Sequence, residues 1–122
     1  MESVMSKPTS ELSDELVDDV VCYCKLLADP TRLRIMLILG FQGDLHVSGL
    51  CQQLNLNQPA VSHHLSILKN AGVIDLRREG KHNYYVFVRE PFCKVIKNLI
   101  GVVSDGKNSI SHDGLVLRFK EC

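Results

Sequence analysis

The sequence predicts a mainly α-helical domain that ends in a β-hairpin. From residue 12 to residue 70, apolar side chains recur at helical spacing in segments separated by turn residues. After Gly72 two runs rich in β-branched and aromatic residues flank a charged stretch with a glycine, which is typical of a hairpin. With 122 residues, 45% of them hydrophobic, the chain has the size of one domain. We expect a flexible tail over 1–10, the domain over 11–103 and a polar, loose tail over 104–122.

Two helices are expected in the first third of the chain. The first runs from about Glu11 to Ala28 and is amphipathic. Asp29 and Pro30 are suited to the N-cap and first turn of a second helix. This second helix is expected over about 31–39, with Gly40 as its end. The apolar arc of the first helix contains Leu12, Leu16, Val20, Cys24 and Leu27.

A short third helix, over about 47–54, and a fourth helix after it have the pattern of a helix-turn-helix. Asn57 is a good N-cap for the fourth helix, and a proline such as Pro59 is tolerated in the first turn. The apolar side chains share one arc, and no acidic residue occurs between Leu45 and Asp75. The opposite arc carries short hydrogen-bonding groups and one cation, the types that read base edges and hold phosphates. Its members are Gln58, Ser62, His63, Ser66, Lys69 and Asn70.

The hairpin follows directly, with strand-like runs at 73–76 and 84–88 and a charged turn over 77–83. A last helix begins at Glu90 and Pro91, and the closing LVLRF is either a short strand or a docking segment. Helices, a helix-turn-helix and a two-stranded hairpin together make a winged helix. As the wing, the hairpin would contact the minor groove or the backbone; as a plain charged turn it would have no such role. The basic residues nearest its tip are Arg78, Lys81 and His82.

The distribution of charge favours a nucleic-acid partner, although the net charge of the chain is zero. Before Pro30 seven acidic residues stand against two basic ones. From Pro30 to Lys97 nine basic residues stand against four acidic ones, and four of the five histidines lie there too. The middle of the chain therefore carries a net positive charge, which the negatively charged phosphates of DNA attract.

Three blocks in this order carry a resemblance to a known family: LADPTRLRIMLIL (27–39), NQPAVSHHLSILKNAGVI (57–74) and REGKHNYYVF (78–87). The stretch from about 26 to 88 resembles the ArsR/SmtB family of bacterial winged-helix repressors. The resemblance implies a homodimer through the first and last helices, an inverted-repeat DNA operator, repression, and in many members release by a metal or an oxidant. It also implies that Gln58, Ser62 and His63 contact base edges.

The other histidines are interpreted differently. His64 lies beside the apolar arc of the fourth helix, which favours a structural role or a backbone contact over base reading. His46 and His112 are single histidines in polar loops without a partner at ligand spacing, so we expect both to be solvated.

The cysteines are the candidate sensor residues, because thiolates bind soft metals and are readily oxidised. Residues two apart on a helix point about 200° apart, so Cys22 and Cys24 cannot share one ion, and Cys24 is expected in the core. Cys51 lies where metal-sensing relatives have the first cysteine of a Cys-x-Cys pair, but Gln53 takes the second place.

Two hypotheses about sensing remain open. In the family the first and last helices form the dimer interface, so Cys22 or Cys24 would lie near Cys93, within or between subunits. Three sulfurs would suit arsenite or antimonite, and two would suit a disulfide or a longer sulfur bridge. The alternative is a regulator without an effector.

Other functional classes are less well supported. A winged helix used only as a protein-interaction module is the main alternative, favoured by the zero net charge and the acidic first helix. The sequence has no glycine-rich phosphate loop, no zinc quartet and no nucleophile with a plausible base, so an enzyme is not expected. Without an apolar run of about 20 residues or a signal core, and with an odd number of cysteines, the chain is expected in the reducing cytoplasm.

Overall fold

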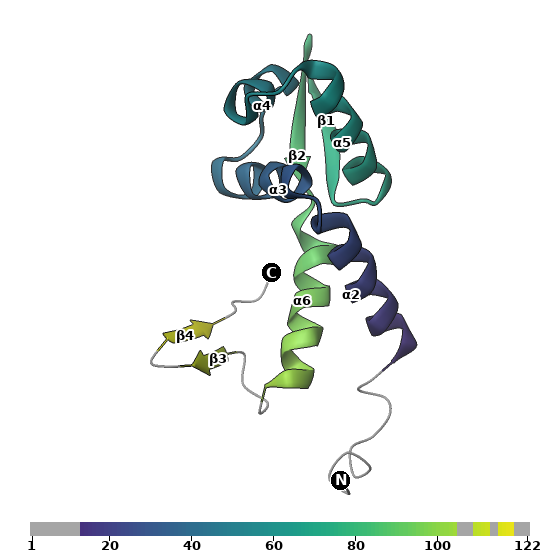
Figure 1. Cartoon of the computed structure of the whole chain (residues 1–122), viewed down its shortest axis with the longest axis vertical. Coiled ribbons are helices and arrows are strands. Elements are labelled where there is room, and N and C mark those ends of the chain that lie inside the picture. The colour runs from purple at the N-terminus through teal and green to yellow at the C-terminus, as the bar shows by residue number, and fades with distance from the viewer. Residues whose placement is uncertain (1–12, 105–108, 113–114, 119–122) are drawn as a thin grey trace, which may run out of the picture. The chain divides into compact units, whose positions relative to one another are not determined.

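The computed structural model describes residues 13–104, 109–112 and 115–118 (Figure 1). The chain divides into two compact units. Residues 24–91 form one unit, and residues 1–23 with 92–122 form the other. The tail expected over 1–10 lies outside the described residues.

The unit of residues 24–91 is a winged helix-turn-helix, as the sequence predicts. It contains α3 (Pro30–Gln42), α4 (Val47–Leu54), α5 (Gln58–Asn70), β1 (Ile74–Glu79) and β2 (His82–Phe87). The two strands pair antiparallel, and the three helices pack around one small apolar core beside them. The largest fully buried side chains are Ile35, Leu39, Leu50, Val61, Leu65, Leu68, Val73 and Ile74.

The loop between α3 and α4 is joined to the wing by backbone hydrogen bonds. The N–H of Tyr85 donates to the carbonyl of Leu45 at 2.8 Å, and the N–H of Leu45 donates to the carbonyl of Tyr85 at 3.2 Å. This bridge adds a third short segment beside β2 and fixes the start of the helix-turn-helix against the hairpin.

The N-cap predicted for α3 is confirmed, and the predicted end is wrong. Asp29 accepts a hydrogen bond from the backbone N–H of Arg32 at 3.0 Å. The helix continues past Gly40 to Gln42 and is capped by Gly43, whose φ of 91° favours glycine. Gly40 lies within the helix beside the Phe87 ring, where a Cβ would be in ordinary van der Waals contact at 3.4 Å.

The hairpin turn is tighter than the sequence predicts. Glu79 pairs with His82, so only Gly80 and Lys81 form the loop, and Gly80 has a φ of 61°. The expected turn over 77–83 is therefore wrong, because most of its charged residues belong to the strands. Both faces of this part of the hairpin are exposed. The sequence there therefore lacks the alternation of apolar and polar residues by which a half-buried strand is recognised, and the strands are not predicted to extend this far.

The other unit contains the first and last helices, which share an aromatic contact. These are α2 (Asp14–Leu27), up to residue 23, and α6 (Arg89–Val103), from residue 92. The rings of Tyr23 and Phe92 meet edge to face, with their centroids 5.3 Å apart. Ser13 marks the start of α2, because its hydroxyl oxygen accepts a hydrogen bond from the N–H of Leu16 at 3.1 Å.

Two short strands lie in the stretch expected to be loose. β3 (Ser109–His112) pairs antiparallel with β4 (Leu115–Arg118). Of the two alternatives for the closing LVLRF, β4 covers its first four residues as a strand. None of the helices within the described residues is both long and apolar enough to cross a membrane.

Candidate nucleic-acid interface

The helix α5 presents one apolar and one polar face, as the sequence predicts. Asn57 caps it, accepting a hydrogen bond from the N–H of Ala60 at 2.9 Å, and a proline occupies the first turn. The buried residues are Val61, Leu65 and Leu68. On the other face Gln58, His63, Ser66, Lys69 and Asn70 are exposed, and Ser62 is half-buried.

This polar face is suited to a polyanion. It has no acidic residue, and its last turn carries Lys69. The hydroxyl of Ser66 donates to the carbonyl of Ser62 at 3.0 Å, which leaves the hydroxyl oxygen of Ser66 as an acceptor. The amide, imidazole and hydroxyl groups together supply the donors and acceptors needed to read base edges.

His64 turns away from the polar face. Its side chain is 19% exposed, and its Nδ1 lies 3.9 Å from a carboxylate oxygen of Asp29, the N-cap of α3. That Nδ1 atom is buried and makes no hydrogen bond within the described residues. The pKa of Asp29 is lowered, first by the backbone N–H of Arg32 and to a smaller extent by the charge of His64. The position agrees with the structural role expected for His64.

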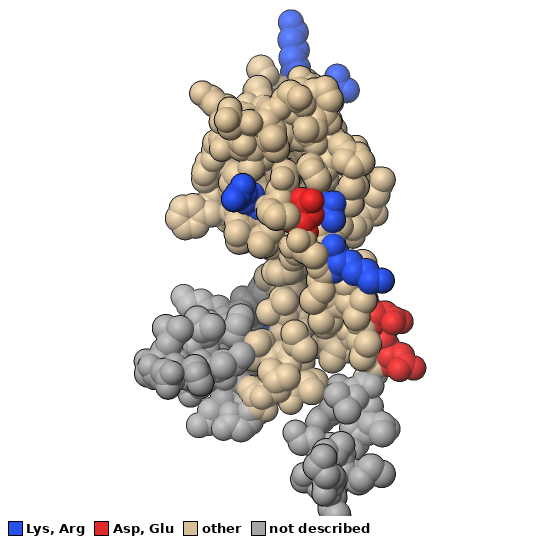
Figure 2. Space-filling view, viewed as in Figure 1, with Lys and Arg blue, Asp and Glu red and all other residues tan. Residues whose placement is uncertain are grey.

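The wing supplies a second group of exposed basic side chains. Arg78, Lys81 and His82 are all exposed. Lys81 lies in the two-residue turn, Arg78 lies in β1 before it, and His82 is the first residue of β2 after it. Figure 2 shows Lys and Arg side chains at the tip of the wing, and Asp and Glu side chains both on the winged-helix unit and on α2.

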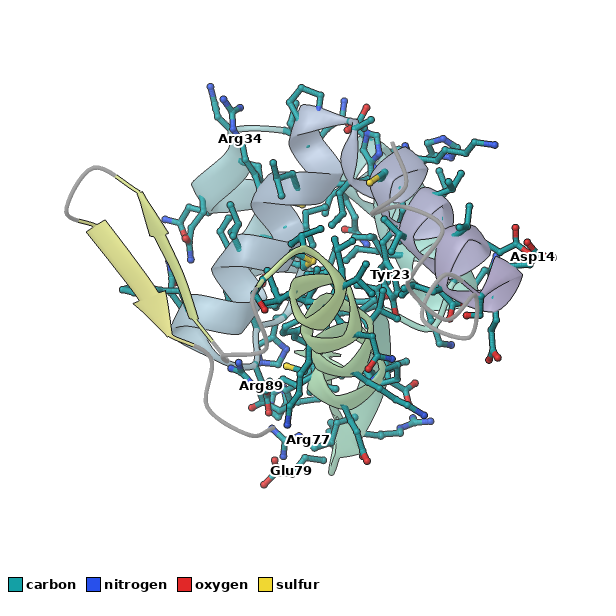
Figure 3. The ribbon with its side chains drawn as sticks, turned by 90° about the horizontal axis from the view of Figure 1, so that it is seen from below. Asp14, Tyr23, Arg34, Arg77, Glu79 and Arg89 are labelled. Carbon is teal, nitrogen blue, oxygen red and sulfur yellow. The ribbon has the colours of Figure 1, made fainter. Side chains whose placement is uncertain are left out.

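Arg77 differs from its neighbour Arg78, and sequence analysis missed its role. Its guanidinium bonds the carboxylates of Asp44 at 2.8 Å and Glu79 at 2.6 Å, and its Cζ lies 5.0 Å from the Tyr84 ring centroid. Figure 3 shows Arg77 and Glu79 side by side. Desolvation acts to lower the pKa of Arg77, but the hydrogen bonds and charges of Glu79 and Asp44 together outweigh it and raise this pKa. Arg77 thus ties the wing to the α3–α4 loop, and no local pattern in the sequence indicates this link.

His46 is another residue that sequence analysis misinterpreted. Its Nδ1 lies 3.1 Å from the carbonyl of Asn83, and its ring is 4.3 Å from that of Tyr84 and 5.1 Å from that of His82. The expectation of a solvated histidine is wrong, because the bridge at Leu45 brings this loop beside β2. The side chain of His112 lies outside the described residues.

The cysteines lie in different settings. Cys22 and Cys24 are exposed, and Cys51 and Cys93 are half-buried. The expected core position of Cys24 is therefore wrong for the single chain. Of the residues of α2 only Leu26 is buried, so the apolar arc is not covered at Cys24. No disulfide joins these four, and the described residues contain no group of three His, Cys, Asp or Glu able to hold a metal ion.

A capped helix with a polar, acid-free face and a basic wing beside it is the architecture of a DNA-binding regulator. Comparison with known proteins agrees: residues 29–75 match the family model of bacterial regulatory proteins of the arsR family. An arsenic resistance transcriptional regulator of Pseudomonas putida is 36% identical over 115 residues, which cover 94% of this chain and 88% of the relative. The chain belongs to the ArsR family and is a DNA-binding transcriptional regulator.

Solved structures of transcriptional regulators have a similar fold. The transcriptional repressor BigR from Xylella fastidiosa matches with a TM-score of 0.62 and 26% identity, over 74% of this chain and 88% of that one. A homodimeric winged helix-turn-helix DNA-binding domain from Mycobacterium bovis matches with a TM-score of 0.58 and 33% identity, over 76% and 87%. The named relatives are transcriptional regulators and not enzymes.

Proposed function

We propose that the chain acts as a homodimeric repressor that binds an inverted-repeat operator on double-stranded DNA in the cytoplasm, without catalysing a reaction. The acid-free polar face of α5 is the observation that carries this proposal. Gln58, Ser62 and His63 would contact bases, and Ser66 and Lys69 would hold the backbone. Arg78, Lys81 and His82 of the wing would contact the minor groove or the phosphates beside it.

A homodimer is supported by two observations. The relative from Mycobacterium bovis is homodimeric, and the exposed apolar side chains of α2, Val17 and Val21, are of the kind that a subunit interface covers. Two α5 helices related by a two-fold axis would meet successive major grooves, about 34–36 Å apart. An inverted-repeat operator is the DNA counterpart of that symmetry.

Selection of DNA from a random pool by the full chain tests the proposal. We expect enrichment of an inverted repeat with half-sites one helical turn apart, and two chains bound per duplex. The triple variant Gln58→Ala, Ser62→Ala, His63→Ala should fold, because these side chains lie outside the core, and should enrich no sequence. If the unaltered chain also enriches none, the winged helix serves as a protein-interaction module instead.

We also propose that a thiol-binding inducer releases the DNA, with Cys93 and a cysteine of α2 as its ligands. Cys22 precedes Tyr23 and Cys93 follows Phe92, and these two rings are in contact, so the two cysteines flank the junction of α2 and α6. The relative from Pseudomonas putida is an arsenic resistance regulator. Two thiols would suit a disulfide or a longer sulfur bridge made by a sulfur-transferring oxidant. Arsenite or antimonite would exchange one hydroxide for each thiol, with one water released per sulfur bound, and would take a third sulfur where the dimer supplies one.

A further inference from the structure

Two histidines that are 36 positions apart in the sequence lie together on the wing. His46 is the residue before α4, and His82 is the first residue of β2. Their ring centroids are 5.1 Å apart, with an angle of 67° between the ring planes. The Tyr84 ring lies against His46 at 4.3 Å, so it limits the orientations open to that imidazole. We call His46 and His82 the wing histidine pair.

The hydrogen bond of His46 determines which ring nitrogen is available. A backbone carbonyl can only accept, so the contact of 3.1 Å with the Asn83 carbonyl requires the proton on Nδ1. In the neutral ring, Nε2 then carries a lone pair and no proton. Metal-binding histidines are typically held in this way, with one nitrogen donating to a backbone carbonyl and the other facing the ion.

The spacing of the two rings fits a shared ion. Imidazole nitrogens bind zinc at about 2.0–2.1 Å, which puts each ring centroid about 3.2 Å from the metal. Two such rings at a tetrahedral angle have centroids about 5.1–5.2 Å apart, close to the separation of the wing histidine pair.

The surrounding charges allow a cation to bind. The guanidinium of Arg77, whose Cζ lies 5.0 Å from the Tyr84 ring, is paired with both Asp44 and Glu79, so its positive charge is largely offset. His82 is exposed and gives an ion access from solvent. Because the described residues contain no group of three protein ligands, water would complete the coordination.

We infer that the wing histidine pair binds a borderline divalent metal ion of the zinc class through two imidazole nitrogens. The site is separate from the cysteines, since imidazoles select zinc whereas arsenite requires thiolates. A bound ion would join the residue before α4 to β2 and so tie the helix-turn-helix to the wing. This inference does not depend on the proposed inducer.

Titration of the full chain with zinc chloride, followed through the NMR signals of the histidine rings, tests the inference. The ring signals of His46 and His82 should shift together and saturate at one equivalent, and those of the exposed His63 should stay unchanged. His46→Gln and His82→Gln should each weaken zinc binding at least tenfold, and in each variant the remaining ring should no longer shift at the original zinc concentration. Tyr84→Phe, which keeps the ring against His46, should bind zinc normally.

Two results would overturn the inference. One is that neither ring signal moves at a millimolar zinc concentration. The other is that His82 still shifts at the original zinc concentration in the His46→Gln variant, which would make each imidazole an independent weak ligand. Amide spectra of every variant without zinc show whether the wing has kept its fold.

Discussion

His63 and His64 are adjacent residues of the same type with opposite surroundings. Successive positions on a helix differ by about 100°, so His63 is exposed while His64 faces Asp29 at the start of α3. The exposure of His63 suits the base contact proposed for it, and the position of His64 suits a structural role. The residue type alone does not assign a role; the position of the residue on the helix does.

Replacement of His63 by Ala should weaken operator binding by about 1–3 kcal/mol, because a base contact is lost, and should affect random DNA far less. Titration of labelled operator and random duplexes at one salt concentration measures both losses. Asn98→Ala, at an exposed position of α6, is the matched control. Equal losses on the two duplexes would make His63 a backbone contact, and an unchanged operator affinity would remove it from the interface.

The stability of α5 depends on its cap. Asn57→Ala removes the side-chain oxygen that accepts from the Ala60 N–H, and we expect a loss of about 0.5–2 kcal/mol in the free energy of unfolding. Urea denaturation of the variant and the parent chain checks this value. Asn70→Ala, at the exposed last position of the helix, should change the stability much less; a similar loss there would show that the cap is not the cause.

In the wing, Lys81 and Arg77 form a matched pair of basic residues with different surroundings. Lys81 is exposed in the turn, so Lys81→Ala should weaken operator and random DNA alike and lower the salt slope by about one, as one phosphate contact is lost. Arg77→Ala should leave the slope unchanged, because this guanidinium already bonds two carboxylates. Affinities measured over a range of salt concentrations distinguish the two. An unaltered slope for Lys81→Ala would mean that Lys81 does not touch the DNA backbone.

For the whole molecule, the proposed sensor links the thiols to the spacing of the two reading helices. A ligand held between α2 and α6 would shift the dimer interface, and DNA accepts half-sites only about one helical turn apart. Cys93→Ser should bind the operator as the parent chain does and should remain bound when arsenite, antimonite or a sulfur-transferring oxidant is added. Cys51→Ser, which alters a half-buried thiol on α4, should still be released. If Cys93→Ser is released at the same inducer concentration as the parent, Cys93 is a packing residue and the sensor model is wrong.

Local patterns in the sequence determined most of the elements. The caps at Asp29 and Asn57 mark the starts of α3 and α5, as observed. The helical spacing of apolar residues predicts α4 over 47–54, as observed, and separates the polar face of α5 from its buried face. These features depend on interactions within one or two helical turns, so a short stretch of sequence contains all the information they need.

Tertiary structure decided the remaining features, because their partners are distant in the chain. Arg77 pairs with Asp44, 33 positions away, and His46 with the carbonyl of Asn83, 37 positions away. Gly40 lies inside α3, beside the Phe87 ring of β2, 47 positions away. Periodicity and propensity contain no information about which distant segments meet. The roles of these residues therefore follow only from the packing of the α3–α4 loop and α3 against the wing.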